Sequence, residues 1–176
     1  MSPESPVRTR TVTWSDPAEV ALAAIQLGGF EYLQRVGEDD SIRAPVAQLL
    51  GFEDPEAGEG QAVFHLTPQE FHYNPLGSVH GGVIATLLDS ALGCAVHTLL
   101  PKTDAYTTLE LKVNFVRAVT KETGRIRTEA RVVHIGGKVA TAEGRVVDEQ
   151  GNLYAHATTT CLLMRGKFEQ YFPAVA

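Results

Sequence analysis

The strongest constraint on the fold is the segment VHGGVIATLLDSALGCAVHTLL, which is apolar or small on nearly every side. It runs from Val79 to Leu100, and its only Asp, Glu, Lys or Arg is Asp89. A helix of about twenty residues is ~30 Å long. Because a helix that is apolar all round must be buried all round, the rest of the chain is expected to wrap around this one.

The flanking segments alternate with a period of two, which predicts strands. One strand is expected before the helix, at 61–67, and four after it, with turn signals between them. In the first of these four, Leu109, Leu111 and Val113 are expected to share one face. Consecutive strands joined by short turns pair antiparallel, and their Ala, Gly and Thr positions leave room for a helix. The predicted fold class is α+β, an antiparallel sheet wrapped around a long central helix, with later strands at 107–115, 125–132, 140–146 and 153–164.

The first 50 residues lie outside this pattern. A polar, proline-containing arm comes first. Asp16 followed by Pro17 marks a helix start, and the helix is expected to run to about Arg35, weakened by the glycine pair at 28–29. A short apolar piece follows at 44–50. No linker defines a second large domain, so we expect an arm and helical extension over 1–50, one domain over 51–165 and a C-terminal tail over 166–176.

Composition excludes several classes of protein. The 176 residues are 44% hydrophobic and 20% charged, enough to bury a full core. A formal net charge of -6 argues against a nucleic-acid partner, so an anionic ligand must be held by a local patch. The sequence shows no secretory signal and no membrane span, and its cysteines, Cys94 and Cys161, lie in apolar surroundings. We expect a cytoplasmic protein with free thiols, one disulfide being the alternative.

Asp89 is the sharpest anomaly within the apolar helix. No residue one helical turn away can neutralise it, and an unpaired buried carboxylate is costly. In one interpretation it faces solvent or accepts a hydrogen bond from another segment. In the other it is a desolvated general base or nucleophile.

The glycine-rich segment 77–82 opens the same helix. Free N–H groups at a helix N-terminus favour negative charge, and glycines let a ligand approach the backbone, as an oxyanion hole requires. Glycines before helices are also common, and both interpretations stay open. The segment matches no phosphate-binding, dinucleotide or GxSxG motif. His80 has no second ligand at metal spacing, so we expect it to brace the glycine turn.

The combination of Asn74, His80, Gly81-Gly82 and Asp89, within HYNPLGSVHGGVIATLLDSALG, resembles the PaaI-type hotdog-fold acyl-CoA thioesterases. The resemblance covers roughly residues 51–164 and includes the order of strand, helix and four strands. It implies a hotdog fold and hydrolysis of an acyl-CoA thioester. No cofactor is implied, because coenzyme A is part of the substrate.

The resemblance also implies catalytic roles. Asp89 would be the base or nucleophile, and the Gly81 N–H would polarise the thioester carbonyl. Asn74 would orient the attacking water or assist the carbonyl, His80 would hold the loop, and Thr108 would help to place the water. Some relatives carry Glu in place of Asp89, which leaves the mechanism open.

Substrate binding is assigned by the resemblance to Gly82, Gly137 and Lys138, although a Gly-Gly-Lys hairpin is also an ordinary turn. Phe71, Tyr73 and Tyr106 could line an acyl pocket or belong to the core. The acyl group itself stays open. Candidate cations for the coenzyme A phosphates are Lys138 and four arginines, of which the last three also fit a solvated strand face: Arg117, Arg125, Arg127 and Arg131.

The spacing of two assigned residues predicts self-association. Gly81 and Asp89 are eight residues apart, about 12 Å along a helix. Reacting atoms must come within ~3–3.5 Å, so the two residues would serve one reaction only from different chains. We therefore expect a homodimer with two active sites at its interface, and the resemblance adds homotetramers built as dimers of dimers.

Two other functions remain as alternatives. A non-catalytic acyl-CoA-binding module, used for sensing or assembly, would keep the groove and the dimer, but Asp89 argues against it. A hydratase or dehydratase on the same fold pairs a His with an Asp in a motif that this sequence lacks.

Overall fold

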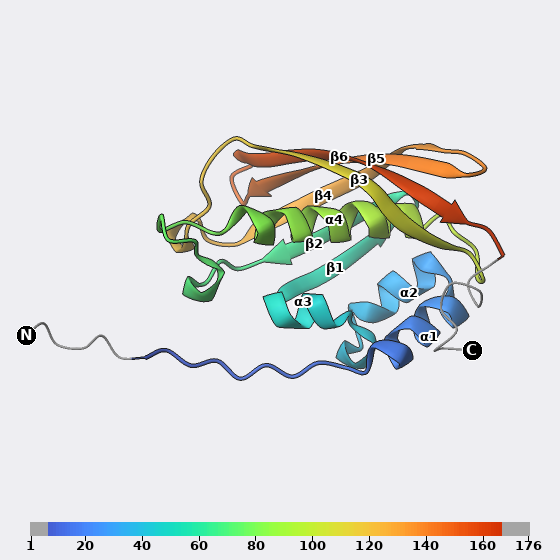
Figure 1. The fold of residues 1–176 in the computed structure, drawn as a ribbon, viewed down its shortest axis with the longest axis horizontal. Coiled ribbons are helices and arrows are strands. Elements are labelled where there is room, and N and C mark those ends of the chain that lie inside the picture. Colours follow the sequence, from blue (N-terminus) through green and yellow to red (C-terminus); the bar gives the residue numbers. More distant parts are fainter. Residues whose placement is uncertain (1–6, 167–176) are drawn as a thin grey trace, which may run out of the picture.

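The computed structural model describes residues 7–166 and consists of one long helix packed against one curved sheet, with a layer of short helices beside it (Figure 1). The long helix, α4, spans Gly81–His97. Its central side chains are inaccessible to solvent, among them Leu87, Leu88 and Leu92. The predicted long apolar helix is therefore confirmed, although it begins two residues later and ends three residues earlier. Burial on all sides is not observed within one chain, because one side of α4, including Val83, Thr86 and Ser90, is only partly covered.

The sheet has six antiparallel strands in the order β1-β2-β4-β5-β6-β3. The predicted α+β class and the wrapping of the sheet around α4 are confirmed (Figure 1). The strands are β1 (Phe52–Gly58), β2 (Gln61–Leu66), β3 (Ala105–Phe115), β4 (Ile126–Ile135), β5 (Val139–Asp148) and β6 (Leu153–Met164).

One strand was absent from the sequence prediction. The residues of β1, FEDPEAG, carry a proline and three carboxylates and show no clean alternation. They form a hairpin with β2 and a sheet edge, where a proline is tolerated because no second neighbour needs its N–H. A register shift between Glu53 and Glu56 accommodates Asp54, whose φ of 38° is positive.

The pairing of β3 also differs from the expectation for consecutive strands. β4, β5 and β6 pair in chain order, whereas β3 pairs with β6 across the sheet. The chain crosses between β3 and β4 through residues 116–125, which include the 3-10 turn Lys121–Thr123. As a result β3 is the second edge of the sheet.

Small side chains on the inner face bring α4 close to the sheet. Ala140, Ala142 and Ala157 are buried there. At Gly144 a Cβ atom would lie 3.2 Å from a methyl carbon of Leu92 and 3.0 Å from a backbone oxygen of β4. The small residues seen in the sequence are thus explained by the short distance between helix and sheet.

The N-terminal extension is helical as predicted, but its first helix is broken. α1 (Pro17–Leu27) and α2 (Gly29–Val36) are separated by Gly28, whose φ of 76° no α-helix accommodates. The 3-10 turn η1 (Asp40–Ile42) and α3 (Pro45–Leu50) complete the layer. Asp16 caps α1 by accepting a hydrogen bond from the Ala18 N–H at 2.8 Å.

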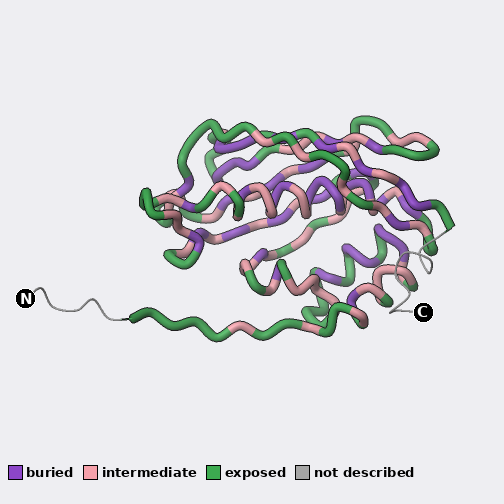
Figure 2. Tube along the Cα trace, in the orientation of Figure 1, coloured by how far each residue is buried: buried purple, intermediate pink, exposed green. Residues whose placement is uncertain are grey.

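The extension has a solvated outer side and a covered inner side (Figure 2). Residues 7–15 precede α1 and have no regular secondary structure. Among them, Arg10 places its guanidinium carbon 3.8 Å from the centre of the Phe71 ring. Residues 1–6 of the predicted arm lie outside the described residues, as does the predicted C-terminal tail beyond Gly166. Within the described range, no helix has the length and apolar character needed to cross a membrane.

Candidate active site

Asp89 lies half-buried in the middle of α4 and is held by Thr108 from β3. The Thr108 hydroxyl donates to the Asp89 carboxylate, with 2.9 Å between Oγ1 and Oδ1. No Lys or Arg of residues 7–166 forms an ion pair with Asp89. The carboxylate is therefore oriented by a hydroxyl rather than neutralised by a cation.

A β-bulge directs Thr108 toward the helix. The register between β3 and β6 shifts between Thr108 and Glu110, and Leu109 is 58% exposed. On the helix side lie Thr108 before the bulge and Leu111 and Val113 after it. The single face expected for Leu109, Leu111 and Val113 is thus wrong, because one extra residue reverses the alternation.

The Asp89 carboxylate borders a cavity of about 470 Å³, here called the Asp89 cavity. Its walls come from α4, from Phe64 of β2, from the start of β3 and from the N-terminal extension. Within it, the ring centroid of His97 lies 5.9 Å from that of Tyr32 and 5.6 Å from that of Tyr106. Burial lowers the pKa of His97 to about 4 and raises the pKa of the Cys94 thiol to about 12. The cavity is therefore a poorly solvated, largely apolar environment.

Of the three aromatic residues considered for an acyl pocket, only Tyr106 lines the Asp89 cavity. The Tyr73 hydroxyl accepts a hydrogen bond from the Lys121 N–H at 2.6 Å, and Phe71 lies beneath Arg10. Cys94 and Cys161 are both free thiols.

The N-terminus of α4 lies at a second hollow of about 290 Å³, here called the Gly81 hollow. Asn74, Gly81, Phe115 and Arg117 are among its lining residues. The Gly81 N–H has no hydrogen-bond acceptor among the described residues. This free amide and the positive end of the helix dipole create a site suited to a negative oxygen.

Asn74 and His80 shape the loop that leads into α4. The Asn74 side-chain oxygen accepts from the Leu76 N–H at 2.8 Å, and its amide nitrogen donates to the Ser78 hydroxyl at 3.1 Å. His80 caps the helix, with its Nδ1 accepting from the Gly82 N–H at 2.9 Å. The amide of Gly82 is therefore already occupied, which leaves the Gly81 amide free for a ligand.

The two groups of assigned residues are not brought together within one chain. The Asp89 cavity contains Asp89 and Thr108, the Gly81 hollow contains Asn74 and Gly81, and the two share no lining residue. The Gly137-Lys138 turn joins β4 to β5 and lines neither of them.

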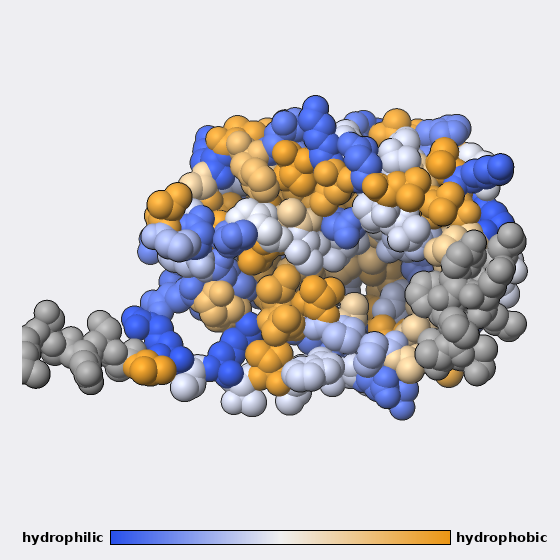
Figure 3. Space-filling model, in the orientation of Figure 1, coloured by the Kyte–Doolittle hydropathy of each residue, from blue (hydrophilic) through white to orange (hydrophobic). Residues whose placement is uncertain are grey.

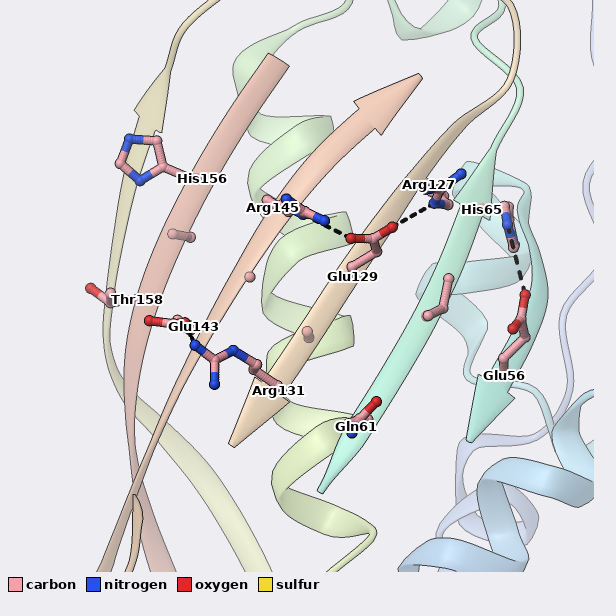
Figure 4. Close-up of a pocket in the computed structure, with 14 residues that line it drawn as sticks. Glu56, Gln61, His65, Arg127, Glu129, Arg131, Glu143, Arg145, His156 and Thr158 are labelled. Atoms are coloured by element: carbon pink, nitrogen blue, oxygen red, sulfur yellow. Dashed lines mark hydrogen bonds and ion pairs between the residues drawn. The ribbon is translucent and has the colours of Figure 1, made fainter. Parts of the chain in front are cut away.

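Three of the candidate cations are engaged on the outer face of the sheet. Arg127 pairs with Glu129, Arg131 with Glu143, and Arg125 with Glu53 and Asp54. Figure 4 shows the first two pairs in a separate hollow of about 930 Å³ on this face. These three arginines thus match the alternative in which they form a solvated strand face.

Arg117 is differently placed. Its guanidinium carbon lies 5.4 Å from the centre of the Tyr154 ring, and both residues line the Gly81 hollow. No ion pair involves Arg117 within residues 7–166. In the same part of the chain, no three His, Cys, Asp or Glu side chains gather to hold a metal ion.

Comparison with known proteins identifies relatives over most of the chain. Residues 76–155 match the model of the thioesterase superfamily. A Halobacterium salinarum protein named as a candidate esterase is 33% identical over 128 residues, which cover 70% of this chain and 82% of that protein. The 1,4-dihydroxy-2-naphthoyl-CoA hydrolase of Listeria monocytogenes is 26% identical over 60% of this chain and 85% of the hydrolase.

A solved structure agrees with these matches. A mutant of the phenylacetic acid degradation protein PaaI from Thermus thermophilus superposes with a TM-score of 0.61 and 28% identity, covering 68% of this chain and 98% of that one. The fold, the shared segment around α4 and these relatives lead to one conclusion: the chain belongs to the thioesterase superfamily, as a PaaI-type hotdog-fold member.

Proposed function

We propose that the protein hydrolyses an acyl-CoA thioester to the free acid and coenzyme A. The observation that carries this proposal is the Asp89 carboxylate, oriented by Thr108 on the wall of a largely apolar cavity. Its helix also begins with a free backbone amide at Gly81. The Listeria relative supports the proposal, because its name specifies a coenzyme A thioester as substrate.

The chemistry assigns one task to each group. The Gly81 N–H and the helix dipole stabilise the negative oxygen that develops as the thioester carbonyl is attacked. Asp89 either removes a proton from the attacking water or attacks the carbonyl itself, forming a mixed anhydride that water then opens. By either route the carbon–sulfur bond breaks and the thiolate leaves, taking up a proton. Thr108 holds the carboxylate in position, and Asn74 and His80 hold the loop that presents the amide.

The active site is proposed to form between two chains. Gly81 and Asp89 are about 12 Å apart along one helix, too far to act on a single carbonyl. β3 is a sheet edge of 11 residues, and Leu109 and Phe115 on it are 58% and 57% exposed. An isologous contact between two copies would cover this edge and bring Gly81 of one copy to Asp89 of the other.

The phosphates of coenzyme A need local cations in a chain of net charge -6. Arg117 is the best-placed candidate, because it borders the Gly81 hollow and forms no ion pair among residues 7–166. Lys138 stays a weaker candidate on an exposed turn.

The first experiment is a panel of acyl-CoAs incubated with the full chain, with detection of the released thiol. Asp89→Asn keeps the shape and removes the base, so turnover should fall by at least ~10²-fold. Ser90→Ala is the matched control, since Ser90 borders the same cavity and has no catalytic task. Wild-type rates in Asp89→Asn would contradict the assignment. Binding without cleavage by the wild type would instead favour a non-catalytic acyl-CoA-binding module.

A single turnover in isotope-labelled water separates the two roles of Asp89. Label that enters the protein carboxylate in that turnover indicates a nucleophile, because water then opens the anhydride at the aspartyl carbon. Label that enters only the free acid indicates a general base.

A further inference from the structure

We infer that the N-terminal extension, α1 to α3, is the acyl-selectivity element of this protein. It forms the wall of the Asp89 cavity opposite α4, and this wall limits the length of a neutral, apolar acyl group. The inference rests on the proposed thioesterase function and adds to it the class of acyl group and the residues that select it.

The first observation is the origin of the cavity wall. Nine of the eighteen residues that line the Asp89 cavity belong to the extension, so the core fold supplies only half of the enclosure. All nine precede the segment at 76–155 that matches the superfamily model. Figure 3 shows the surface hollowed between the body of the molecule and the layer of short helices. Half of the lining at the acyl end of the site is therefore supplied by helices of the chain that the superfamily match does not include.

The second observation is that the extension is docked tightly on α4. The Gly29 N–H donates to the Leu100 carbonyl at 3.3 Å. A Cβ atom at Gly29 would lie 1.8 Å from the His97 carbonyl oxygen, so only glycine allows this approach. Tyr32 packs its ring against His97, and its hydroxyl donates to the Ile42 carbonyl at 2.9 Å. The wall thus has a fixed position relative to Asp89.

The third observation is the charge of the wall. The lining of the whole cavity has two charged residues other than Asp89, and both form ion pairs at 2.8 Å, Arg43 with Asp40 and Asp104 with Arg165. The Nε of Arg43 is buried without a hydrogen-bond partner, but the guanidinium charge is balanced by Asp40. The remaining side chains are apolar or neutral, and a charged acyl tail would be desolvated there with no uncompensated charge to balance it. A neutral, apolar acyl group matches this wall.

The size of the wall side chains sets the limit on length. Four alanines of the extension border the cavity, and each leaves room that a larger side chain would fill: Ala21, Ala24, Ala44 and Ala47. A hydrophobic pocket discriminates by ~10-fold or more for one methylene group. Single substitutions on this wall should therefore shift the preferred acyl length and leave the chemistry at Asp89 intact.

The test compares three variants of the full chain on straight-chain acyl-CoAs from acetyl to dodecanoyl. Ala24→Leu narrows the cavity, and Val46→Ala, at a position that is 41% exposed on α3, widens it. Ala18→Leu is the matched control, because Ala18 lies on α1 and does not line the cavity. The readout is kcat/KM for each chain length, together with the Kd of non-hydrolysable thioether analogues.

Ala24→Leu should lower kcat/KM for the longest accepted acyl groups by ~10-fold or more and leave the shortest within about two-fold. Val46→Ala should extend the accepted length, and Ala18→Leu should reproduce the wild-type profile. Unchanged length profiles in both cavity variants, with normal wild-type turnover, would overturn this inference and leave the thioesterase proposal intact. A wild type that neither cleaves acyl-CoAs nor binds their analogues would overturn the proposed function, and this inference with it.

Discussion

The two ends of α4 present opposite environments. At its N-terminus the backbone amide of Gly81 faces a small hollow with Asn74 and Arg117, where polar groups and the helix dipole favour an anion. Toward its C-terminus, Asp89 and His97 border a larger, mostly apolar cavity that the N-terminal extension encloses.

In the proposed mechanism, this difference makes one chain incomplete as a catalyst. A thioester needs a donor for its carbonyl oxygen and a carboxylate for the attack, and the helix separates these two groups by two turns. The polar end suits the carbonyl oxygen and the coenzyme, and the apolar end suits the acyl group. In the proposed dimer the polar end of one copy faces the apolar end of the other.

The largest expected effect tests the polar end alone. Gly81→Pro removes the free N–H at the first position of α4, where proline fits a helix, and His80 before it has the extended backbone that a following proline requires. Turnover should fall by ~10²–10³-fold. Gly81→Ala is the control, because it keeps the N–H and adds a Cβ 3.2 Å from the exposed Phe115 ring. Equal losses in the two variants would show that steric change, not the lost amide, is responsible.

The next effect tests whether the two ends come from different chains. Asp89→Asn and Gly81→Pro chains, carrying different tags, are co-expressed and the mixed dimers are allowed to form. A mixed dimer holds one site with both wild-type groups, so random pairing should restore about a quarter of wild-type activity. If each chain carried a complete site, mixing would give no more than the average of the two variants.

The third prediction tests whether the apolar end is buried, through the pH dependence of the stability that His97 contributes. Burial lowers the pKa of His97 to about 4, below the usual value of 6.5, so the folded state keeps this ring neutral while the unfolded chain takes up a proton. This contribution to stability is complete above about pH 6.5 and is lost as the pH falls toward 4. Between pH 7.5 and pH 5 the loss should be about 2 kcal/mol.

The measurement is chemical denaturation of the wild type and His97→Phe at both pH values. Phenylalanine keeps a ring between Tyr32 and Tyr106 and removes the titrating group. The wild type should lose about 2 kcal/mol more than the variant on acidification. An equal loss in both proteins would mean that His97 is solvated and that the extension does not seal this end.

The smallest expected effect concerns the hydroxyl that orients Asp89. Thr108→Val removes the hydrogen bond at nearly constant volume, and kcat should fall roughly 10-fold with KM almost unchanged. Thr108→Ser should restore most of the rate, and Thr107→Val, at the exposed neighbouring position, is the control. Loss of rate in Thr107→Val as well would indicate a general effect on β3 rather than loss of this contact.

Much of the architecture could be predicted from local patterns. The buried helix followed from its apolar circumference, and β6 followed from its alternation with the same bounds, Leu153–Met164. The strand β1 escaped prediction because an edge strand next to solvent tolerates proline and carboxylates, which removes the hydrophobic signal. The sequence predicted only a weakened helix at Gly28 and not a break, because the φ of 76° at Gly28 depends on the docking of α2 on α4.

The candidate site likewise has features that the sequence predicts and features that it does not. The sequence by itself determined which chemical groups are available, since a lone carboxylate in an apolar helix and glycines at its start are local features. Only the tertiary structure decided their surroundings. The bulge after Thr108 directs that hydroxyl to Asp89, and the extension folds back to enclose the cavity. Both outcomes depend on contacts between segments far apart in the chain, and no local periodicity encodes such contacts.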